Sequence, residues 1–530
     1  MHPAPVPASV ERPQASAPSD DQVDGLLPPW PQAWLTVLAL GLVALLLRGF
    51  SVFGYPYPSG SDYGQTVLQA ELFLEQGRLP AAVPYFQLGQ TDWAPMPGSA
   101  LLYGGLAALA GRPVIDLLPL MLIFALVEVG GVYMLAWRAF RRLDAAAIAA
   151  GVVAVLPAAP EMMAWSGYPN LMALALIPVT LAGWLACWQR PTRQRLLLTV
   201  LLVCGTVSLH HVSALWLVLS LGLFALVQMV RQPVRSLARL APLLMGGLVV
   251  GFPIAWHIAN VYVASGIVDV LYAPGDRFAA ARVTWEGWSR LLEPLSLVLL
   301  LGGFVSFLRM RRVASEARIL LAAYTAVSLV FAFGWIVGIQ FYYTRALHYL
   351  SLPIALGAAA LVIHWRREAV RVAVVVVLLA FLGISTLFRA EEVADYYQVL
   401  SPATLEAVDW LSSHSEPDDV VVVSTFLGFH MPRLLQRPLM VAMTPELIGN
   451  PQEMPVAQDA LAVMMGLYNM DEVLDRRQVR FVMLRSRFPD IPSPFRSRMV
   501  MEASPRLSLA FSNEDILIYE VLDGSGSDSS

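Results

Sequence analysis

The chain has 530 residues and a formal net charge of −4, with 57% of its residues hydrophobic and only 14% charged. Soluble globular proteins carry about 25% charged residues, so this composition excludes an ordinary soluble domain. The near-neutral charge indicates no nucleic-acid partner. The two cysteines, Cys187 and Cys204, lie within or beside apolar runs, so no disulfide framework is expected in a domain outside the membrane.

Residues 1–31 precede the first apolar run. They are rich in Pro, Ala and Ser, and they carry Asp20, Asp21 and Asp24. A secretory signal is shorter and has basic residues ahead of its apolar stretch. We therefore expect this segment to be a disordered cytoplasmic tail.

Apolar runs without a polar face follow, such as LTVLALGLVALLL and VAVVVVLLAFLGI. A soluble helix needs a polar face, whereas a helix in lipid does not, so these runs predict transmembrane helices. Short loops rich in arginine stay in the cytoplasm, and each interval between two such loops must hold an even number of crossings. The arginine-rich loops are 138–142, 190–195, 231–239, 309–318 and 366–371.

This parity, with roughly 20 residues for each crossing, predicts about eleven transmembrane helices and a cytoplasmic N-terminus. One crossing each is expected at 33–50, 114–137 and 372–388, and two each at 144–188, 196–230, 240–308 and 319–364. The pair in 196–230 requires a tight outer turn at His210 and His211. The segment 98–111 is short and rich in glycine, so we expect a juxtamembrane or re-entrant helix. If this segment crosses the membrane, the total becomes twelve helices with the N-terminus outside, or thirteen if the first outer loop hides a further crossing.

Two large elements fall on the extracytoplasmic side of this topology, the loop at 54–97 and the tail at 390–522, which follows a transmembrane domain at 32–389. In the tail, PATLEAVDWLSSH and DEVLDRR have helical character, while DVVVVST, VRFVML and DILIYEV are strand-like. The tail is long enough to have its own core. The predicted fold is therefore an all-α polytopic membrane bundle with a C-terminal extracytoplasmic α/β domain and a disordered end at 523–530.

Unusual polar residues gather on the same extracytoplasmic side. They are Asp62, Glu71 and Asp92 in the first loop, Glu161, Tyr168 and Asn170 at the next turn, His210 and His211, then Asp269, Asp276 and Glu286, and finally Arg345 and His348. Ionisable residues at the edge of a bundle often line a cavity or pathway. An ordinary wet loop is the alternative for each one, and Glu71 with Glu75 at i,i+4 is typical of a solvated helix face. The convergence of carboxylates, a histidine pair and an arginine favours a site.

The layout of these segments resembles a known superfamily. A first span is followed by GSDYGQTVLQAELFLEQGRLP, then by PYFQLGQTDWAPMPGSALLYGGLAALAG, and then by a span that ends in LAWRAFRR. This order is similar to that of the GT-C superfamily of lipid-dependent glycosyltransferases, which includes protein O-mannosyltransferases, oligosaccharyltransferases and aminoarabinose transferases. The segments WSGYPNLMALALIPVTLAGWL and TRALHYLSLPIAL are also similar to those of bacterial and archaeal members.

The resemblance implies a multi-pass enzyme of the inner (plasma) membrane of a bacterium. It would transfer a sugar from a polyprenyl-phosphate donor, held in the bilayer, to an extracytoplasmic glycan, lipid or protein acceptor. Asp62 matches the superfamily's Asp after the first span and would be the general base. Arg345 would bind the leaving phosphate. The other expected substrate-binding residues are His348, Glu161, Asn170, His210 and His211.

Some members use an Asp-X-Asp motif that helps to bind a divalent cation such as Mg²⁺ or Mn²⁺. Here Asp62 has no second acid at that spacing, so a cation would need another ligand, for which Glu161 is a candidate. Two adjacent histidines, such as His210 and His211, point apart on a helix and are not a convincing metal pair.

Two other classes of protein stay open. A transporter or lipid flippase would place polar residues near mid-membrane, where Glu128 is the main charged residue. A non-catalytic scaffold of the same fold would use the outer domain to bind envelope partners. The one-sided placement of the polar residues favours the enzyme.

Overall fold

The computed structural model describes residues 32–80, 82–89, 96–260, 282–310, 313–339, 343–365, 367–443, 453–486 and 494–522. The expected tails at 1–31 and 523–530 lie outside the described residues, as do Asp92, Asp269 and Asp276.

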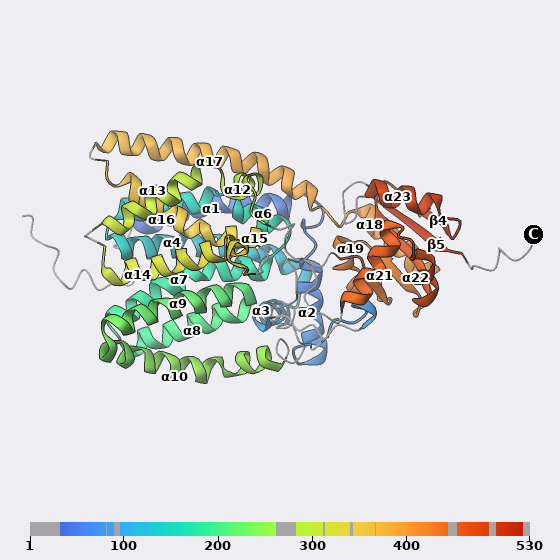
Figure 1. Cartoon of the computed structure of the whole chain (residues 1–530), viewed down its shortest axis with the longest axis horizontal. Helices are drawn as coiled ribbons and strands as arrows, with labels where there is room; N and C mark the ends of the chain where they lie inside the picture. Colours follow the sequence, from blue (N-terminus) through green and yellow to red (C-terminus); the bar gives the residue numbers. More distant parts are fainter. Residues whose placement is uncertain are drawn as a thin grey trace, which may run out of the picture.

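A bundle of long helices lies side by side, and a small α/β domain sits at one end of it (Figure 1). We call this end of the bundle the domain end. In chain order the bundle contains α1 (Gln32–Phe53), η3 (Val114–Leu122), α4 (Ile123–Phe140), α5 (Leu143–Val155), α6 (Ala158–Ala164), α7 (Tyr168–Gln189), α8 (Arg193–Leu209), α9 (His211–Arg231), α10 (Pro233–Ile258), α12 (Trp285–Leu292), α13 (Leu295–Arg309), α14 (Ser315–Ala332), α15 (Tyr343–Ala346), η7 (Leu347–Leu350), α16 (Ser351–Val362) and α17 (Glu368–Tyr396).

Nine helical segments in the described ranges are long and apolar enough to cross a membrane. A tenth is formed if α12 and α13, which meet at an angle of 81°, together make one broken span. The polytopic membrane bundle is thereby confirmed. The eleventh predicted crossing falls on α8, which has 17 residues and packs against α7, α9 and α10. The sequence predicted a tight turn at His210 and His211. In the structure His210 alone separates α8 from α9, and His211 is the first residue of α9.

Two shorter elements lie between the bundle and the C-terminal domain (Figure 1). They are α2 (Tyr63–Gln76) and α3 (Pro97–Ala110), which pack against each other, with the short helix η2 (Phe86–Gly89) between them in the chain. At 14 residues, α3 is too short to span a bilayer of about 30 Å at 1.5 Å per residue. It agrees with the predicted juxtamembrane or re-entrant helix.

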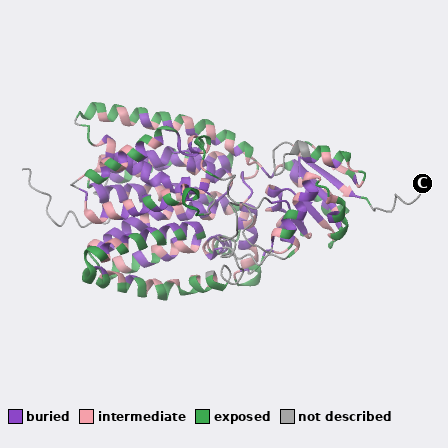
Figure 2. Ribbon diagram, in the orientation of Figure 1, coloured by how far each residue is buried: buried purple, intermediate pink, exposed green. Residues whose placement is uncertain are grey.

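Burial separates central helices from peripheral ones (Figure 2). In their most apolar windows, 83% of the residues of α7 and 89% of those from α15 to α16 are buried, against 6% for α10 and 17% for α17. All four are strongly hydrophobic, so the exposed apolar faces of α10 and α17 are suited to contact with lipid.

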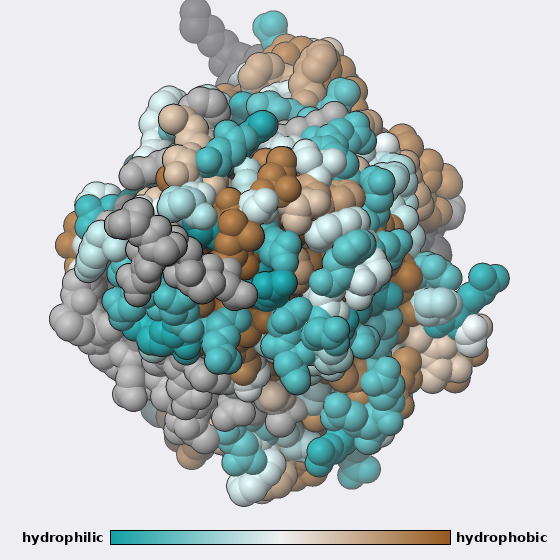
Figure 3. Space-filling view, turned by 90° about the vertical axis from the view of Figure 1, so that its right-hand side faces the viewer, coloured by the Kyte–Doolittle hydropathy of each residue, from teal (hydrophilic) through white to brown (hydrophobic). Residues whose placement is uncertain are grey.

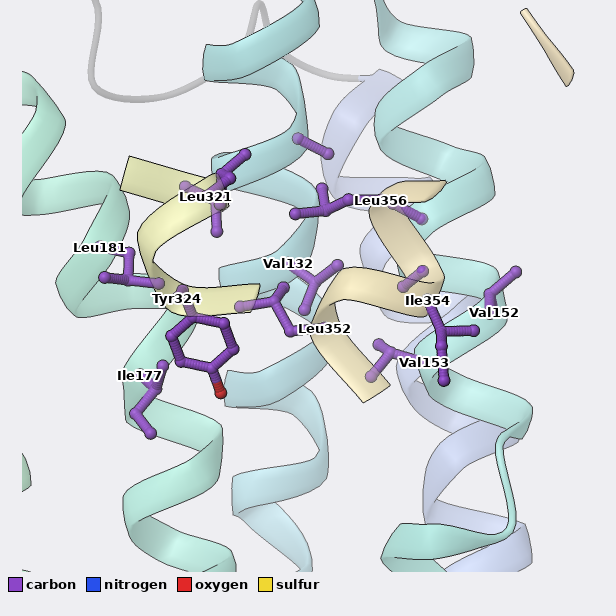
Figure 4. Close-up of a cluster of buried hydrophobic side chains, with 14 of the residues drawn as sticks. Val132, Val152, Val153, Ile177, Leu181, Leu321, Tyr324, Leu352, Ile354 and Leu356 are labelled. Atoms are coloured by element: carbon purple, nitrogen blue, oxygen red, sulfur yellow. The ribbon is translucent and has the colours of Figure 1, made fainter. Parts of the chain in front are cut away.

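The central core is built from α4, α5, α7, α14 and α16, whose branched and aromatic side chains interlock (Figure 4). Small residues let the backbones approach closely, as is common between membrane helices. An example is Gly303 of α13 against α16, where an added Cβ would lie 2.3 Å from the Cα of Gly357. No larger side chain fits at this crossing unless the helices separate.

An ion pair between α1 and α4 lies inside the bundle. The Arg48 guanidinium of α1 is 2.6 Å from the Glu128 carboxylate of α4, and the exposed fractions of the two side chains are 0% and 12%. Glu128 therefore faces the interior and is neutralised there. The pair connects α1 to α4, which pack against each other.

The C-terminal domain contains a five-stranded sheet of order β2-β1-β3-β5-β4. The strands are β1 (Val420–Val423), β2 (Leu439–Val441), β3 (Val479–Arg485), β4 (Leu507–Ser512) and β5 (Ile516–Val521). The first three are parallel, and β5 runs antiparallel to both β3 and β4. The predicted strands at β1, β3 and β5 are confirmed, whereas β2 and β4 were not predicted.

Alternating side chains along each strand face opposite sides of the sheet, so each face has its own core. Val421 and Val423 join the face covered by α18 (Pro402–His414), while Val422 joins the opposite face. That face is covered by α21 (Met454–Met465), α22 (Met470–Arg476) and α23 (Pro494–Ala503). Viewed from this end, the molecule shows a mainly hydrophilic surface with smaller apolar patches (Figure 3).

Candidate functional site

Asp62 lies at the start of α2, in the loop that leaves α1 at the domain end. Although it occupies the N-cap position, its carboxylate makes no capping hydrogen bond to the helix backbone. It accepts a hydrogen bond from the Ser61 hydroxyl at 3.1 Å. The side chain is only partly buried, so its carboxylate is available for another partner.

The backbone on both sides of Asp62 is held by the turn between α6 and α7. The Tyr63 N–H donates to the Ser166 Oγ at 2.9 Å, and that hydroxyl donates to the Trp165 carbonyl at 2.7 Å. Gly60 has φ +107°, and an added Cβ would lie 2.2 Å from the Ser166 Oγ. A side chain at residue 60 is therefore excluded by both conformation and space.

Arg345, on α15, is a positively charged residue whose electric field acts on Asp62. Its guanidinium lies over the Trp165 ring, 5.3 Å from the ring centroid, which is a cation–π distance. Burial raises the pKa of the Asp62 carboxyl, and the Arg345 charge and the Ser61 hydrogen bond act in the opposite direction. The electric field of Arg345 also acts on His210, His211 and His348.

A buried hydrogen-bond network around Asn170 adjoins His210. The Asn170 Oδ1 accepts from the Ser213 hydroxyl at 2.8 Å and from the Tyr349 hydroxyl at 2.9 Å. The Asn170 amide nitrogen is buried and has no hydrogen-bond partner within the described part of the chain. The His210 Nδ1 accepts from the Ser213 N–H at 3.4 Å and so caps α9. His210 is thus partly committed to a structural role.

Glu161 and His348 lie on the α6 side of the site. The Glu161 carboxylate is buried and pairs with Arg290 of α12 at 3.1 Å. The ring of the buried His348 hydrogen-bonds to the Ala158 backbone, while its Nδ1 has no partner among the described residues. The charges of both Arg345 and Arg290 act on His348.

The donor set does not fit a divalent cation bound jointly by Asp62 and Glu161. Glu161 is engaged by Arg290, and Asp62 has an arginine rather than a second acid in its field. Mg²⁺ and Mn²⁺ prefer several oxygen ligands with carboxylates among them. Within the described ranges, no cluster of three or more His, Cys, Asp or Glu residues could hold a metal. No catalytic step is therefore assigned to a cation.

Glu71 corrects an expectation. Instead of belonging to a solvated helix face, its carboxylate receives two hydrogen bonds from the Arg433 guanidinium of the C-terminal domain, at 2.9 and 3.2 Å. Glu75, one turn later, is exposed as expected. The i,i+4 spacing is compatible with either outcome, because it says nothing about a partner from a distant segment.

Three buried tyrosines near Asp62 were also missed as a group. The hydroxyls of Tyr63, Tyr103 and Tyr168 have no hydrogen-bond partner within the described residues, and their side chains pack in one cluster. Burial raises the pKa of Tyr63 and of Tyr103, and proximity to Tyr168 raises both further. The tyrosines come from GSDYG, LLYGG and SGYPN, so the available signal was one tyrosine beside a glycine in each of three outer elements.

With this geometry in place, the fold can be compared with known structures. AglB, an oligosaccharyltransferase from Archaeoglobus fulgidus solved with an inhibitory peptide and a dolichol-phosphate, matches with a TM-score of 0.59 at 13% identity, over 86% of this chain and 69% of AglB. ArnT from Cupriavidus metallidurans, bound to undecaprenyl phosphate, matches with a TM-score of 0.55 at 11% identity, over 92% of this chain and 97% of ArnT. These proteins are GT-C glycosyltransferases.

This chain has the GT-C fold. A third similar structure, the arabinofuranosyltransferase AftD from Mycobacteria, gives a TM-score of 0.54 at 16% identity, covering 93% of this chain but only 40% of AftD. Residues 117–344 match a family of unknown function, DUF6541. A comparison with curated protein sequences gives no match. At these identities the solved structures establish the fold, and they leave the reaction to be argued from the site.

Proposed function

We propose that the chain is a membrane glycosyltransferase that moves a sugar from a polyprenyl-phosphate donor to an extracytoplasmic acceptor. The observation that carries the proposal is the setting of Asp62. Its carboxylate makes no capping hydrogen bond, its loop is fixed by a hydrogen bond to Ser166, and it lies in the electric field of Arg345. Fixed geometry of this kind suits a general base, since proton transfer requires the base within hydrogen-bond reach of the nucleophile.

In the proposed reaction, the Asp62 carboxylate takes the proton of the acceptor nucleophile. The freed electron pair forms a bond to the anomeric carbon of the sugar. The bond between that carbon and the phosphate oxygen breaks, and its electron pair leaves with the polyprenyl phosphate. Arg345 stabilises the growing negative charge on the phosphate, because a guanidinium can bind two phosphate oxygens at once.

The surroundings supply candidate contacts for the two substrates. The Asn170 amide and the His348 Nδ1 are buried donors or acceptors left without a partner in the described part of the chain, and buried polar groups are normally satisfied. A bound sugar or phosphate would satisfy them. The lipid part of the donor would lie along the apolar bundle, as the dolichol and undecaprenyl carriers named with AglB and ArnT suggest.

The charge distribution within the spans supports an enzyme over a flippase. Arg48 and Glu128 neutralise each other at 2.6 Å, whereas a transport pathway for a lipid phosphate would need accessible polar residues at this depth. The scaffold alternative predicts no turnover and is decided by the same assay as the enzyme.

The test uses the full chain in lipid nanodiscs with a panel of polyprenyl-phosphate sugars, and it measures release of the polyprenyl phosphate. Asp62→Asn should reduce release by a factor of roughly 10²–10⁴, the usual contribution of a general base. Asp116→Asn is the matched control, because Asp116 is exposed at the same end of the bundle and should leave release unchanged. Unchanged turnover by Asp62→Asn would refute the assigned base. Absence of turnover by the unmodified chain with every donor would refute the proposed function.

A further inference from the structure

The C-terminal domain contacts the Asp62 loop directly through one buried histidine. His430 lies between the short helices α19 (Thr425–Gly428) and α20 (Met431–Leu434), and its exposed fraction is 2%. Its Nε2–H donates to the Gly60 carbonyl at 3.1 Å. Its ring packs edge-on against Tyr63, with the centroids 4.6 Å apart at an interplanar angle of 65°. One side chain therefore contacts the residues on both sides of the Ser61–Asp62 pair.

The C-terminal domain packs so closely against the start of α2 that no side chain fits at residue 64. An added Cβ on Gly64 would lie 2.5 Å from the His430 Nδ1 and 2.5 Å from the Phe429 carbonyl oxygen. A backbone oxygen cannot move aside as the end of a flexible side chain can. Residue 64 must therefore be glycine for the domain to sit at its present distance from α2.

The loop that carries Asp62 is hydrogen-bonded both to the bundle and to the C-terminal domain. Ser166 of the bundle binds the Tyr63 N–H, while His430 of the C-terminal domain binds the Gly60 carbonyl. The Gly60 N–H in turn donates to the Tyr397 carbonyl at 2.8 Å, in the segment that leads into the domain. The backbone around Asp62 is thus fixed by three different parts of the chain, and two of them belong to the C-terminal region.

Further contacts keep the domain in register with the loop. Arg433, three residues after His430, makes the two-bonded ion pair with Glu71, about two turns further along α2 than Gly64. The Gln87 side chain pairs with the edge strand β2, accepting from the Val441 N–H and donating to the Val441 carbonyl, both at 3.1 Å. These contacts are specific and distributed, so His430 meets the loop as part of a defined interface.

The protonation state of His430 suits a fixed structural contact. Burial and the neighbouring Arg433 and Arg485 lower the pKa of His430 to about 4, although its hydrogen bond to Gly60 opposes this. At neutral pH the ring is therefore neutral, with Nε2 as its hydrogen-bond donor. It adds no positive charge of its own beside Asp62, and the charge that acts on this carboxylate remains that of Arg345.

We propose that His430 is a positioning residue through which the C-terminal domain fixes the Asp62 loop in the orientation required for sugar transfer. The proposal rests on the proposed function for its catalytic consequence, while the holding of the loop is a separate, measurable property. It assigns the domain a part in catalysis without any contact between the domain and the reacting atoms.

The first test measures the loop itself, by amide hydrogen exchange of residues 57–68 in the full chain in nanodiscs. His430→Phe keeps a ring but removes the donor, so exchange at Gly60 and the start of α2 should become at least tenfold faster. His430→Gln supplies an amide donor at a similar position and should restore most of the protection. His414→Ala is the matched control, since His414 is exposed on α18 of the same domain and should change nothing. Unchanged exchange in His430→Phe would overturn the proposal.

The second test measures transfer by the same variants. His430→Phe should lower kcat at least tenfold with a KM for the polyprenyl-phosphate sugar within about twofold, because misplacement of the base affects the chemical step more than donor binding. His430→Gln should recover most of kcat. If exchange rises while kcat stays normal, the positioning role is wrong. If the unmodified chain transfers no sugar, the proposed function fails and the catalytic role with it, while exchange still decides whether His430 holds the loop.

Gly64→Ala serves as a second variant in case His430→Phe does not fold. The added methyl group on α2 would clash with the Phe429 carbonyl and with His430, so it should push the C-terminal domain away from α2 while His430 itself is unchanged. It should likewise accelerate exchange at the loop and lower kcat. Protection and kcat equal to those of the unmodified chain would show that the contact does not position the loop.

Discussion

Asp62 illustrates what a single residue can and cannot reveal from sequence. Its setting in PSGSDYG is typical of a turn, and a turn aspartate often serves only as a helix cap. In the structure it occupies the cap position, but its carboxylate makes no capping hydrogen bond and lies in the electric field of Arg345. The difference between the two roles lies in one missing hydrogen bond, which no local pattern specifies. It favours a chemical role over a purely structural one.

The coupling of Asp62 to Arg345 makes a prediction for pH dependence. The base must be ionised, so kcat/KM should rise with pH through the pKa of Asp62, which burial has raised. The Arg345 charge favours the carboxylate, so Arg345→Ala should move this acidic limb to higher pH. It should also lower the maximal rate by a factor on the order of 10²–10³, through loss of phosphate stabilisation.

Arg345→Lys separates the two effects, because a lysine keeps the charge but cannot bind a phosphate as a fork. It should leave the acidic limb near its original position while still lowering the maximal rate. The measurement is the pH profile of polyprenyl-phosphate release for all three proteins. An acidic limb that does not move in Arg345→Ala would show that this arginine does not act on the base.

At the scale of elements, the sequence predicted the helices and strands whose residues form a local hydrophobic or β-branched pattern. The apolar runs became the bundle helices, the single-residue turn at His210 joins α8 to α9, and the β-branched run at 420–423 became β1. Elements that depend on distant partners were missed. The strand β2 has three residues and is completed by parallel pairing with β1, while Gln87 joins its edge from a segment 354 residues away. Such pairings leave no periodic trace in either segment.

The Arg48–Glu128 pair gives a prediction at this scale. Glu128→Gln leaves a fully buried guanidinium without a counter-charge, and such a change costs about 3–5 kcal/mol. We expect a large loss of thermal stability in detergent. Replacing both partners with apolar residues, as in Arg48→Met with Glu128→Leu, should recover most of the loss, because neither charge is then buried.

The matched control is the Arg142–Asp144 pair, whose side chains are 38% and 32% exposed. Asp144→Asn should cost no more than about 1 kcal/mol, since exposed pairs contribute little. Equal losses for Glu128→Gln and Asp144→Asn would show that Arg48 finds another partner or reaches water.

At the scale of the whole molecule, the arginine-rich loops and the C-terminal domain lie at opposite ends of the bundle. Contacts connect loops far apart in sequence at the arginine-rich end: Arg371 pairs with Asp144 at 3.4 Å, and Arg239 donates to the Gln189 carbonyl at 3.5 Å. The domain end holds Asp62, Glu161, Asn170, Arg345 and His348. Loop charge therefore predicted which residues share an end. Loop charge could not predict that Glu71 and Gly60 contact Arg433 and His430 of the C-terminal domain, because charge parity places loops and says nothing about how domains pack.

Membrane orientation follows from this polarity and can be measured directly. The positive-inside rule predicts that the arginine-rich end faces the cytoplasm, so we expect the C-terminal domain and the site on the opposite side of the membrane. The two native cysteines, Cys187 and Cys204, are buried and unpaired, so a background without them is expected to fold. In that background, Glu472→Cys on exposed α22 should react with a membrane-impermeant maleimide in sealed right-side-out vesicles. Arg235→Cys, at the exposed start of α10, should react only after permeabilisation.

The opposite labelling pattern would place Asp62 and Arg345 on the cytoplasmic side. A polyprenyl-phosphate sugar would then have to be used on the face where nucleotide-activated sugars are available, and the argument for an extracytoplasmic acceptor would fail. Labelling of both positions in sealed vesicles would instead indicate leakage, which an impermeant quencher added outside detects. The expected labelling pattern would place Asp62 and Arg345 on the side of the membrane opposite to the arginine-rich loops.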